Sequence, residues 1–347
     1  MVPIAITGSG DGLGDRVPSE SAFDGYGLLA IPRRSDAAGF PPCEGRPPPR
    51  LQLVELESID ALETALADAD YLPDRGLATA LFLSLRLEKP VLLEGEAGVG
   101  KTEAAKALSR VLGSRLIRLQ CYEGLDVAHA VYEWNYSRQL LHIRAAQEGT
   151  VSEEELFGPE FLIRRPLLEA VESPEQVVLL IDEIDRADEE FEAFLLEVLS
   201  DFQITIPEIG TVSAAEHKPA VVLTSNRTRE LHDALKRRCL FHWIDHPSLE
   251  REVEIVELRV PGVSARLARE AAALVHRIRA LDLEKPPGVA ETIDWAQAMT
   301  ALRLDELDEV VVETTLGSLL KVREDLDTVR DAELAELVSE ARASART

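Results

Sequence analysis

The chain has 347 residues, of which 63 are acidic and 37 are basic, so its formal net charge is −26. This length is sufficient for one large domain and one smaller domain. The negative charge repels a phosphate backbone and disfavours non-specific nucleic-acid binding, although it does not exclude a local basic pore.

Cysteine usage and hydropathy favour a cytoplasmic protein. The three cysteines are widely spaced, so the sequence predicts neither a disulfide framework nor a zinc site. The longest uncharged apolar stretch, residues 77–85, is far shorter than the roughly 20 residues that cross a bilayer. We therefore expect no membrane segment.

Residues 1–50 are rich in Gly, Pro, Ser and Asp, a composition that cannot bury enough apolar surface to order itself. This segment contains Thr7–Gly14 after the apolar run Ile4–Ile6, and the pair resembles the glycine-rich turn of short-chain dehydrogenases. A dinucleotide-binding fold needs further βα units after that turn, and the residues that follow are proline-rich instead. We therefore favour a disordered leader over an NAD-linked oxidoreductase.

From residue 51 onward the sequence becomes periodic. Apolar residues at helical spacing predict helices over residues 59–67 and 74–87. Short apolar runs then alternate with helical segments, which is typical of βαβ units and of a parallel sheet covered by helices on both faces. The predicted strands are residues 91–93, 116–119, 177–181, 221–223 and 240–244.

Two segments interrupt this alternation of strands and helices. Residues 131–144 and 202–212 alternate apolar and polar side chains, so each is predicted to be a β-hairpin inserted into the α/β core. After Pro247 only helical patterns remain, which predicts a nucleotide-binding domain over residues 51–247 and a helical domain over 248–347. The helices expected in the second domain are residues 250–258, 263–281, 291–302, 307–320 and 331–341.

A phosphate-binding loop is predicted at residues 95–102. Its sequence, Gly95-Glu96-Ala97-Gly98-Val99-Gly100-Lys101-Thr102, fits GxxxxGK[ST] and lies between a predicted strand and a predicted helix, as that motif requires. The glycines let backbone N–H groups close around phosphates, and the helix N-terminus adds partial positive charge. Lys101 is expected to neutralise the β- and γ-phosphates of ATP, and Thr102 to place its hydroxyl on Mg²⁺.

Two carboxylates follow the apolar run Val177–Ile181, so they emerge at the carboxyl end of a buried strand, where ligands bind in open α/β sheets. Asp182 is expected to hold the Mg²⁺ shell. Glu183 is expected to orient and deprotonate the attacking water. A strand followed by an acidic helix cap gives the same letters, but the phosphate-binding loop upstream favours the catalytic interpretation.

Further polar residues lie at the end of the predicted strand 221–223 and after it. Asn226 is predicted to hold the water against the γ-phosphate, although a turn with a capping residue explains the same position equally well. Arg237 and Arg238 close a predicted helix that begins near Arg229. Cations at a helix C-terminus compensate the macrodipole, and the functional alternative is an arginine that neutralises charge in the transition state.

Together these motifs resemble the AAA+ ATPases, P-loop NTPases in which a three-layer αβα core precedes a small helical lid. The likeness covers about residues 55–325. It is nearest to the MoxR family and, within it, to the ATPases associated with maturation of carbon monoxide dehydrogenase-type molybdenum hydroxylases. The segments that carry the likeness are LQCYEGLD (119–126), YEWNY (132–136), IDEIDR (181–186) and TSNRTREL (224–231).

The resemblance implies a ring, usually a hexamer, with ATP between subunits and the two insertions near a central pore. Arg238, with Arg237, would then act on ATP held by the neighbouring subunit. The implied partners are a protein with a von Willebrand factor A domain and a client metalloenzyme that the ring remodels or metallates. A nucleic-acid motor is the alternative among AAA+ proteins. In one departure, the lid position where many relatives have an arginine reads Val289-Ala290-Glu291-Thr292.

Overall fold

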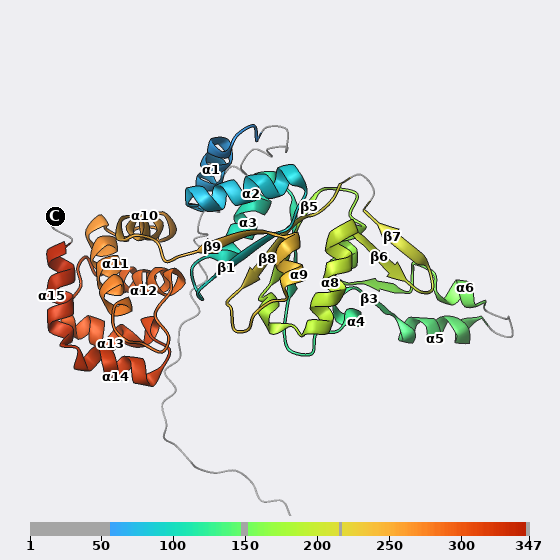
Figure 1. The fold of residues 1–347 in the computed structure, drawn as a ribbon. Helices are drawn as coiled ribbons and strands as arrows, with labels where there is room; N and C mark the ends of the chain where they lie inside the picture. The colour runs from blue at the N-terminus through green and yellow to red at the C-terminus, as the bar shows by residue number, and fades with distance from the viewer. Residues whose placement is uncertain (1–55, 147–151, 215–216, 345–347) are drawn as a thin grey trace, which may run out of the picture. The chain divides into compact units, whose positions relative to one another are not determined.

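The computed structural model describes residues 56–146, 152–214 and 217–344 (Figure 1). The predicted leader and its dehydrogenase-like turn lie outside these residues. Within the described ranges, no helix is both long and apolar enough to cross a membrane.

The central feature is a five-stranded sheet in the order β2-β5-β8-β1-β9, in which every neighbouring pair is parallel. All five predicted strands are confirmed, each at or within two residues of its predicted ends. The inner strands read as continuous apolar runs because helices cover both faces. The strands are β1 Val91–Gly95, β2 Arg115–Gln120, β5 Val177–Asp182, β8 Ala220–Ser225 and β9 Leu240–Ile244.

Two apolar clusters lie on opposite faces of this sheet and confirm the three-layer fold. Alternate strand residues point to opposite faces. Leu92 and Leu179 therefore pack in one cluster, whereas Leu93 and Leu180 pack in the other. The first cluster includes α7 Pro166–Val171 and α8 Glu189–Asp201, and the second includes α1 Ile59–Asp68, α2 Arg75–Leu87 and α3 Lys101–Leu112. Figure 1 shows α1, α2 and α3 on one side of the strands and α8 on the other.

Of the two predicted hairpins, one is confirmed and one is wrong. β6 Gln203–Ile206 pairs with β7 Gly210–Ser213, as the alternation predicts. In the first insertion, by contrast, β3 Tyr132–Trp134 pairs with the distant β4 Leu162–Arg164. The strand stops because the Asn135 side chain accepts a hydrogen bond from the Arg138 N–H and begins a helix. The other elements of this region are α4 Val127–Ala130, α5 Tyr136–Ala145 and α6 Glu153–Leu156.

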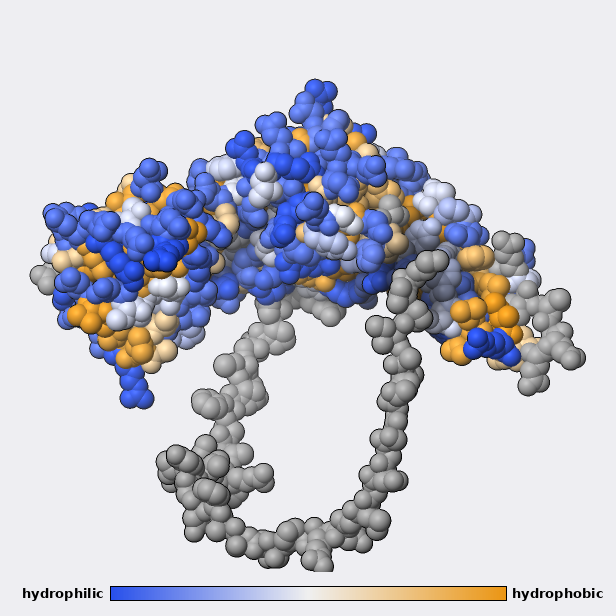
Figure 2. Space-filling model, turned by 90° about the horizontal axis from the view of Figure 1, so that it is seen from below, coloured by the Kyte–Doolittle hydropathy of each residue, from blue (hydrophilic) through white to orange (hydrophobic). Residues whose placement is uncertain are grey.

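Helix α5 leaves large apolar side chains in contact with solvent. Tyr136, Leu140, Leu141 and Ile143 are all exposed, and Leu141 keeps 65% of its surface accessible. Figure 2 shows apolar residues gathered over this insertion. The alternation in the sequence therefore did not reflect a buried strand face, and a patch of this kind is typical of a surface that contacts another protein.

After β9 the structure is entirely helical to residue 344. Two apolar clusters in this region are built only from residues beyond Pro247, with Trp295 fully buried in the larger one. The prediction missed α14, whose charged sequence REDLDTVRD places few apolar residues at helical spacing. The helices are α10 Leu249–Arg259, α11 Ala265–Arg279, α12 Val289–Ala301, α13 Glu309–Leu319, α14 Arg323–Asp331 and α15 Leu334–Ser344.

A buried carboxylate connects three of these helices. Glu252 of α10 is fully buried and accepts hydrogen bonds from both terminal nitrogens of Arg279 at the end of α11. It also accepts a hydrogen bond from Thr292 Oγ1 of α12 at 2.6 Å. Burial alone would raise the pKa of Glu252, but hydrogen bonds from His276 and Arg279 lower this pKa to about 2. The charged form of Glu252 therefore stabilises the packing of α10, α11 and α12.

We predict that Glu252→Gln destabilises the protein by about 3–5 kcal/mol at neutral pH, because it leaves the Arg279 charge without its partner. The folded pKa of Glu252 lies below the ordinary value of 4.5, so the contribution is present above about pH 4.5 and lost as pH falls toward 2. Urea unfolding should show that the difference in unfolding free energy between Glu252→Gln and wild type shrinks as the pH falls across this range. Glu254→Gln, on the exposed face of α10, is the control. A constant difference would contradict the assignment.

Candidate functional site

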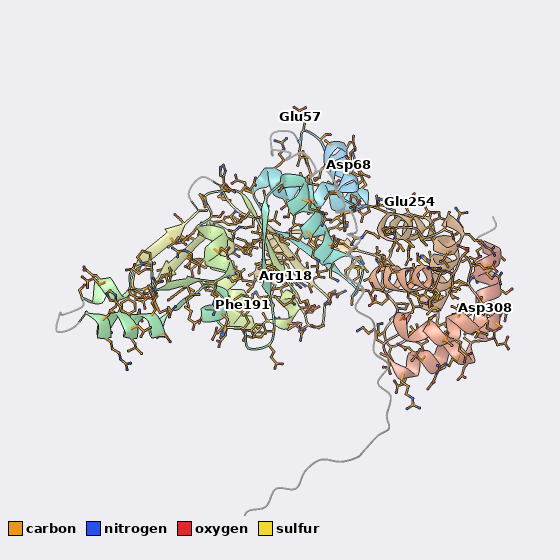
Figure 3. All side chains as sticks on the ribbon, turned by 180° about the vertical axis from the view of Figure 1, so that it is seen from behind. Glu57, Asp68, Arg118, Phe191, Glu254 and Asp308 are labelled. Atoms are coloured by element: carbon orange, nitrogen blue, oxygen red, sulfur yellow. The ribbon has the colours of Figure 1, made fainter. Side chains whose placement is uncertain are left out.

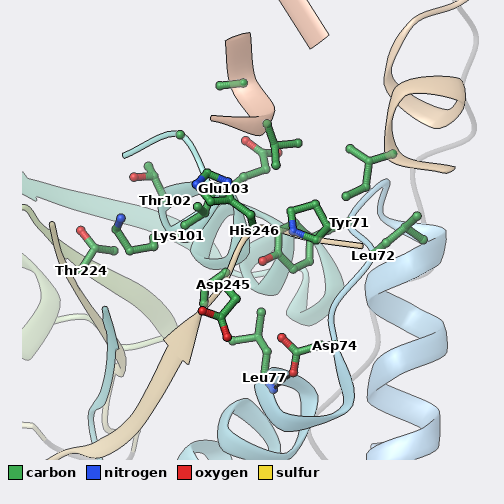
Figure 4. A pocket seen from close by; sticks show the side chains of 18 of the residues that line it. Tyr71, Leu72, Asp74, Leu77, Lys101, Thr102, Glu103, Thr224, Asp245 and His246 are labelled. Atoms are coloured by element: carbon green, nitrogen blue, oxygen red, sulfur yellow. Dashed lines mark hydrogen bonds between the residues drawn. The ribbon is translucent and has the colours of Figure 1, made fainter. Parts of the chain in front are cut away.

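A cavity of about 780 Å³ lies at the carboxyl end of the sheet, where α3 begins. Polar residues from three strand ends line it together with the phosphate-binding loop. Figure 4 shows Lys101, Thr102 and Thr224 apart from Tyr71 and Leu72. The residues at the strand ends and on the loop, here called the polar end, are Gly98, Gly100, Lys101, Thr102, Asp182, Glu183, Thr224 and Asn226. The rest of the lining is mixed: it includes Tyr71, the apolar residues Leu72, Leu77, Ile255 and Ile293, and the charged residues Asp74, Glu103, Arg251 and Arg259.

Glycines shape the backbone of the predicted phosphate-binding loop. Gly98 and Gly100 have φ of 79° and 99°, a left-handed conformation that glycine adopts without steric cost. Gly100 caps α3, so the N–H groups of the first helical turn point toward the cavity. Gly95 and Glu96 do not line the cavity, and their carbonyl groups instead accept hydrogen bonds from a lysine.

That lysine is Lys101, which is buried at the first position of α3. Its Nζ donates to the carbonyl oxygens of Gly95 at 2.7 Å and Glu96 at 2.6 Å. Burial lowers the pKa of Lys101 to about 8, although the nearby carboxylates of Asp185, Asp182 and Glu183 oppose this shift. Lys101 lines the cavity at the N-terminus of α3, so a phosphate bound there would meet both its charge and the N–H groups of the helix.

Asp182 is the point at which several elements meet. Its Oδ1 accepts hydrogen bonds from Thr102 Oγ1 at 2.9 Å and from Thr224 Oγ1 at 2.6 Å. Its Oδ2 accepts from Arg118 Nε at 2.9 Å and Nη2 at 2.6 Å. The carboxylate and hydroxyl oxygens of Asp182 and Thr102 are hard donors of the kind that Mg²⁺ prefers. These two residues therefore fit the predicted metal site.

Glu183 has a strained backbone. Its φ is 55° and its ψ 51°, an uncommon conformation for a residue with a side chain. Its N–H donates to Thr224 Oγ1 at 2.9 Å, and its Oε2 accepts from Arg186 Nη1 at 3.0 Å. Thr224 thus holds both acidic residues at once, which the sequence did not reveal because a threonine at a strand end is common.

Asn226 lies on a loop that a buried aspartate anchors. Asp185 accepts hydrogen bonds from the Asn226 N–H at 3.2 Å, the Thr228 N–H at 2.9 Å and Thr228 Oγ1 at 2.7 Å. Asn226 lines the cavity, so this anchor fixes the strand end that carries it. Asp185 was not among the predicted site residues. Its position three residues after Asp182 is the signal that could have identified it.

The sequence profile of the AAA domain (dynein-related subfamily) matches residues 90–239, which contain every residue of the polar end of the cavity. Residues 90–239 are an AAA+ ATPase domain. The match begins just before β1 and ends just before β9, so it includes the phosphate-binding loop, Asp182, Glu183 and the loop of Asn226.

Two relatives extend this likeness. The chaperone protein ClpB of Rhodopirellula baltica is 29% identical over 240 residues, which are 60% of this chain and 24% of ClpB. An uncharacterized protein of Staphylococcus epidermidis is 30% identical over 175 residues, 49% of this chain and 59% of that protein. The chain thus spans a quarter of the first relative and less than two thirds of the second. Among solved structures, a mutant of Thermotoga maritima RuvB aligns with 80% of this chain, and the aligned part is 75% of the RuvB chain. The sequence identity is 17% and the TM-score is 0.42, which is too low to support the assignment.

The two predicted arginines lie at the end of the AAA+ domain and do not line the cavity. They close α9, which runs over Asp233–Arg238 and begins later than the predicted Arg229. Arg238 donates from Nε to Ser200 Oγ of α8 at 2.7 Å and from Nη1 to the Ala234 carbonyl at 3.3 Å. Arg237 is exposed. The action of both residues on a neighbouring subunit's ATP remains a prediction.

The first turn of α12 touches the phosphate-binding loop of the AAA+ domain. The Ala290 N–H donates to the Gly98 carbonyl at 3.1 Å. A Cβ atom on Gly288 would lie 2.7 Å from the Ala97 carbonyl oxygen and 2.7 Å from Gly98 Cα, so only glycine permits this approach. Glu291 belongs to the segment 289–292, where the resemblance to AAA+ proteins led us to expect an arginine. Its Oε2 accepts a hydrogen bond from the Gly288 N–H at 3.0 Å.

We predict that Thr224→Val destabilises the AAA+ domain by about 1–3 kcal/mol, because valine has a similar shape but leaves the Glu183 N–H without its acceptor and Asp182 Oδ1 with only one of its two donors. Thr224→Ser keeps the hydroxyl and is the matched control, with a smaller loss expected from the missing methyl group. Urea unfolding of both variants measures the difference. Equal stability of Thr224→Val and Thr224→Ser would show that the Thr224 hydroxyl does not hold Asp182 and Glu183 in place.

Proposed function

We propose that the protein binds and hydrolyses ATP with Mg²⁺ in this cavity. The observation that carries the proposal is the direct hydrogen bond between Thr102 of the phosphate-binding loop and Asp182 at the end of β5. This bond joins the loop that would hold the phosphates to the carboxylate that would hold the metal. The polar end of the cavity suits the triphosphate, and the apolar surfaces of Tyr71 and Leu72 suit the base.

The residues at the polar end can perform the reaction as follows. The N-terminus of α3 and Lys101 bind the β- and γ-phosphates. Mg²⁺ bound near Thr102 and Asp182 would supply positive charge to the phosphate oxygens. Glu183 accepts a proton from water as the water oxygen attacks the γ-phosphorus, and Asn226 orients that water. The bond between the γ-phosphorus and the bridging oxygen breaks, which releases ADP and phosphate.

Two substitutions separate binding from hydrolysis. Lys101→Ala is expected to abolish ATP binding, because the ammonium group is lost from the polar end of the cavity. Glu183→Gln should bind ATP with Mg²⁺ yet turn over at least about a hundredfold more slowly, as for loss of a general base. Fluorescent-nucleotide binding and phosphate release measure the two effects. Lys218→Ala and Glu190→Gln are exposed controls outside the cavity.

Normal ATP affinity in Lys101→Ala would place the phosphate site elsewhere. Wild-type turnover in Glu183→Gln would assign the base to another residue. Loss of ATP binding or turnover in both control variants, Lys218→Ala and Glu190→Gln, would instead indicate that such substitutions impair folding in general.

We further propose that ATP turnover drives remodelling of a client enzyme, as in the MoxR-type ATPases that mature molybdenum hydroxylases. The exposed apolar face of α5 supports this proposal, since it offers a surface for another polypeptide. The likeness to a protein named as a chaperone agrees with it. A partner with a von Willebrand factor A domain belongs to the same proposal. Because Glu183→Gln prolongs the ATP-bound state, it is expected to retain client and partner longer than wild type.

We also propose that the active form is a ring, most simply a hexamer, in which Arg238, with Arg237, acts on ATP of the neighbouring subunit. The position of Arg238 outside its own cavity supports this arrangement. An arginine supplied in trans contributes roughly 10³ to 10⁵ in rate. Isolated monomers are therefore expected to be nearly inactive.

The trans assignment is tested by mixing two inactive variants. Lys101→Ala keeps its arginine but does not bind ATP, and Arg238→Ala binds ATP but lacks the arginine. In a mixed ring, some Arg238→Ala sites face an intact arginine, so the mixture is expected to recover turnover. Co-assembled mixtures that stay at the background of either parent would rule out action of Arg238 in trans.

A further inference from the structure

An arginine on the edge of the sheet reaches the metal-binding carboxylate. Arg118 lies on β2, which pairs with β5 at one edge of the sheet. Its Cα lies opposite Leu180, two residues before Asp182. Figure 3 labels Arg118 in the α/β part of the chain. Its side chain therefore runs along the strand direction to the carboxyl end, where Nε and Nη2 both donate to Asp182 Oδ2.

The two oxygens of Asp182 have different partners. Oδ1 accepts from the hydroxyls of Thr102 and Thr224, whereas Oδ2 accepts from the Arg118 guanidinium. The Asp182 side chain is only 3% exposed, so its charge needs a partner. Within the described ranges, Arg118 is the basic side chain that forms an ion pair with it. Arg118 thus binds Oδ2, and Thr102 binds the other oxygen, Oδ1.

The guanidinium is itself held in place. Arg118 Nη2 also donates to the Gln120 side-chain oxygen on the same strand. The hydrogen bonds from Arg118 to Oδ2, together with those from Thr102 and Thr224 to Oδ1, define the rotation of the Asp182 carboxylate. The rigid planar guanidinium holds Oδ2 with two nitrogens, whereas a flexible ammonium group is less well preorganised. Nothing in the sequence indicated this role, because an arginine on an edge strand is ordinarily a solvent-facing residue.

We propose that Arg118 is a positioning residue for Mg²⁺ binding: it fixes Asp182 so that Oδ1 is presented together with Thr102 to the metal ion that accompanies ATP. This inference rests on the proposed function. Partners that orient a ligand in this way typically contribute about ten- to hundredfold in metal affinity. The positive charge of Arg118 acts in the opposite sense, but its side chain is 49% exposed and solvent screens that repulsion. Loss of Arg118 therefore weakens Mg²⁺ binding.

The test measures ATP binding as a function of Mg²⁺ concentration, with a fluorescent ATP analogue and in the Glu183→Gln background, so that hydrolysis does not interfere. Arg118→Ala is expected to raise the half-saturating Mg²⁺ concentration about ten- to hundredfold. Nucleotide binding in EDTA should not change, because Lys101 and the loop remain. Arg118→Lys, which keeps the charge without the planar fork, should give an intermediate increase.

Arg115→Ala is the matched control, since Arg115 begins the same strand and pairs with Glu169 away from the cavity. An unchanged or lower Mg²⁺ requirement in Arg118→Ala would overturn the proposal, and a lower one would show that Arg118 competes with the metal. Should Arg118→Ala fail to fold, an unchanged requirement in Arg118→Lys overturns it equally. If the Glu183→Gln parent shows no Mg²⁺-dependent ATP binding, the proposed function fails instead.

Discussion

The buried carboxylate of Asp182 is the constraint on which the site depends. A charge at this depth persists only with hydrogen-bond donors on both oxygens, and three elements supply them: α3 through Thr102, β8 through Thr224 and β2 through Arg118. These bonds hold the sheet and the first turn of α3 in a fixed relation. Because Thr224 also accepts the Glu183 N–H, the same cluster sets the strained backbone of the neighbouring acid.

The helical region contributes to the cavity through its backbone. The N-terminus of α12 contacts Gly98, and the close approach requires Gly288 to lack a side chain. Glu252 and Arg279 then tie α12 to α10 and α11. An acid, Glu291, faces the loop at this contact, and Lys101 of the AAA+ domain supplies a positive charge at the polar end of the cavity.

Sequence reasoning identified the residues that form contiguous motifs, because strand ends in a parallel sheet converge on one edge whatever the details of packing. Lys101, Asp182 and Asn226, which it assigned to one site, line the same cavity. It failed where a contact joins residues that are distant in the sequence: Arg118 reaches Asp182 from the neighbouring strand β2, and Asp185 anchors a loop 41 residues away. The first insertion was misread because solvent-exposed apolar residues on α5 imitate the alternation of a strand.

A crystal structure with a non-hydrolysable ATP analogue and Mn²⁺ is the most direct test of the proposed site, because the anomalous scattering of Mn²⁺ locates the metal without reference to the protein. We predict one metal peak beside Thr102 Oγ1 and the Asp182 carboxylate, with the phosphates over the N-terminus of α3 and the base near Tyr71. Arg118 should remain on Asp182 Oδ2. Nucleotide bound outside this cavity, or a metal peak remote from Thr102 and Asp182, would contradict the account.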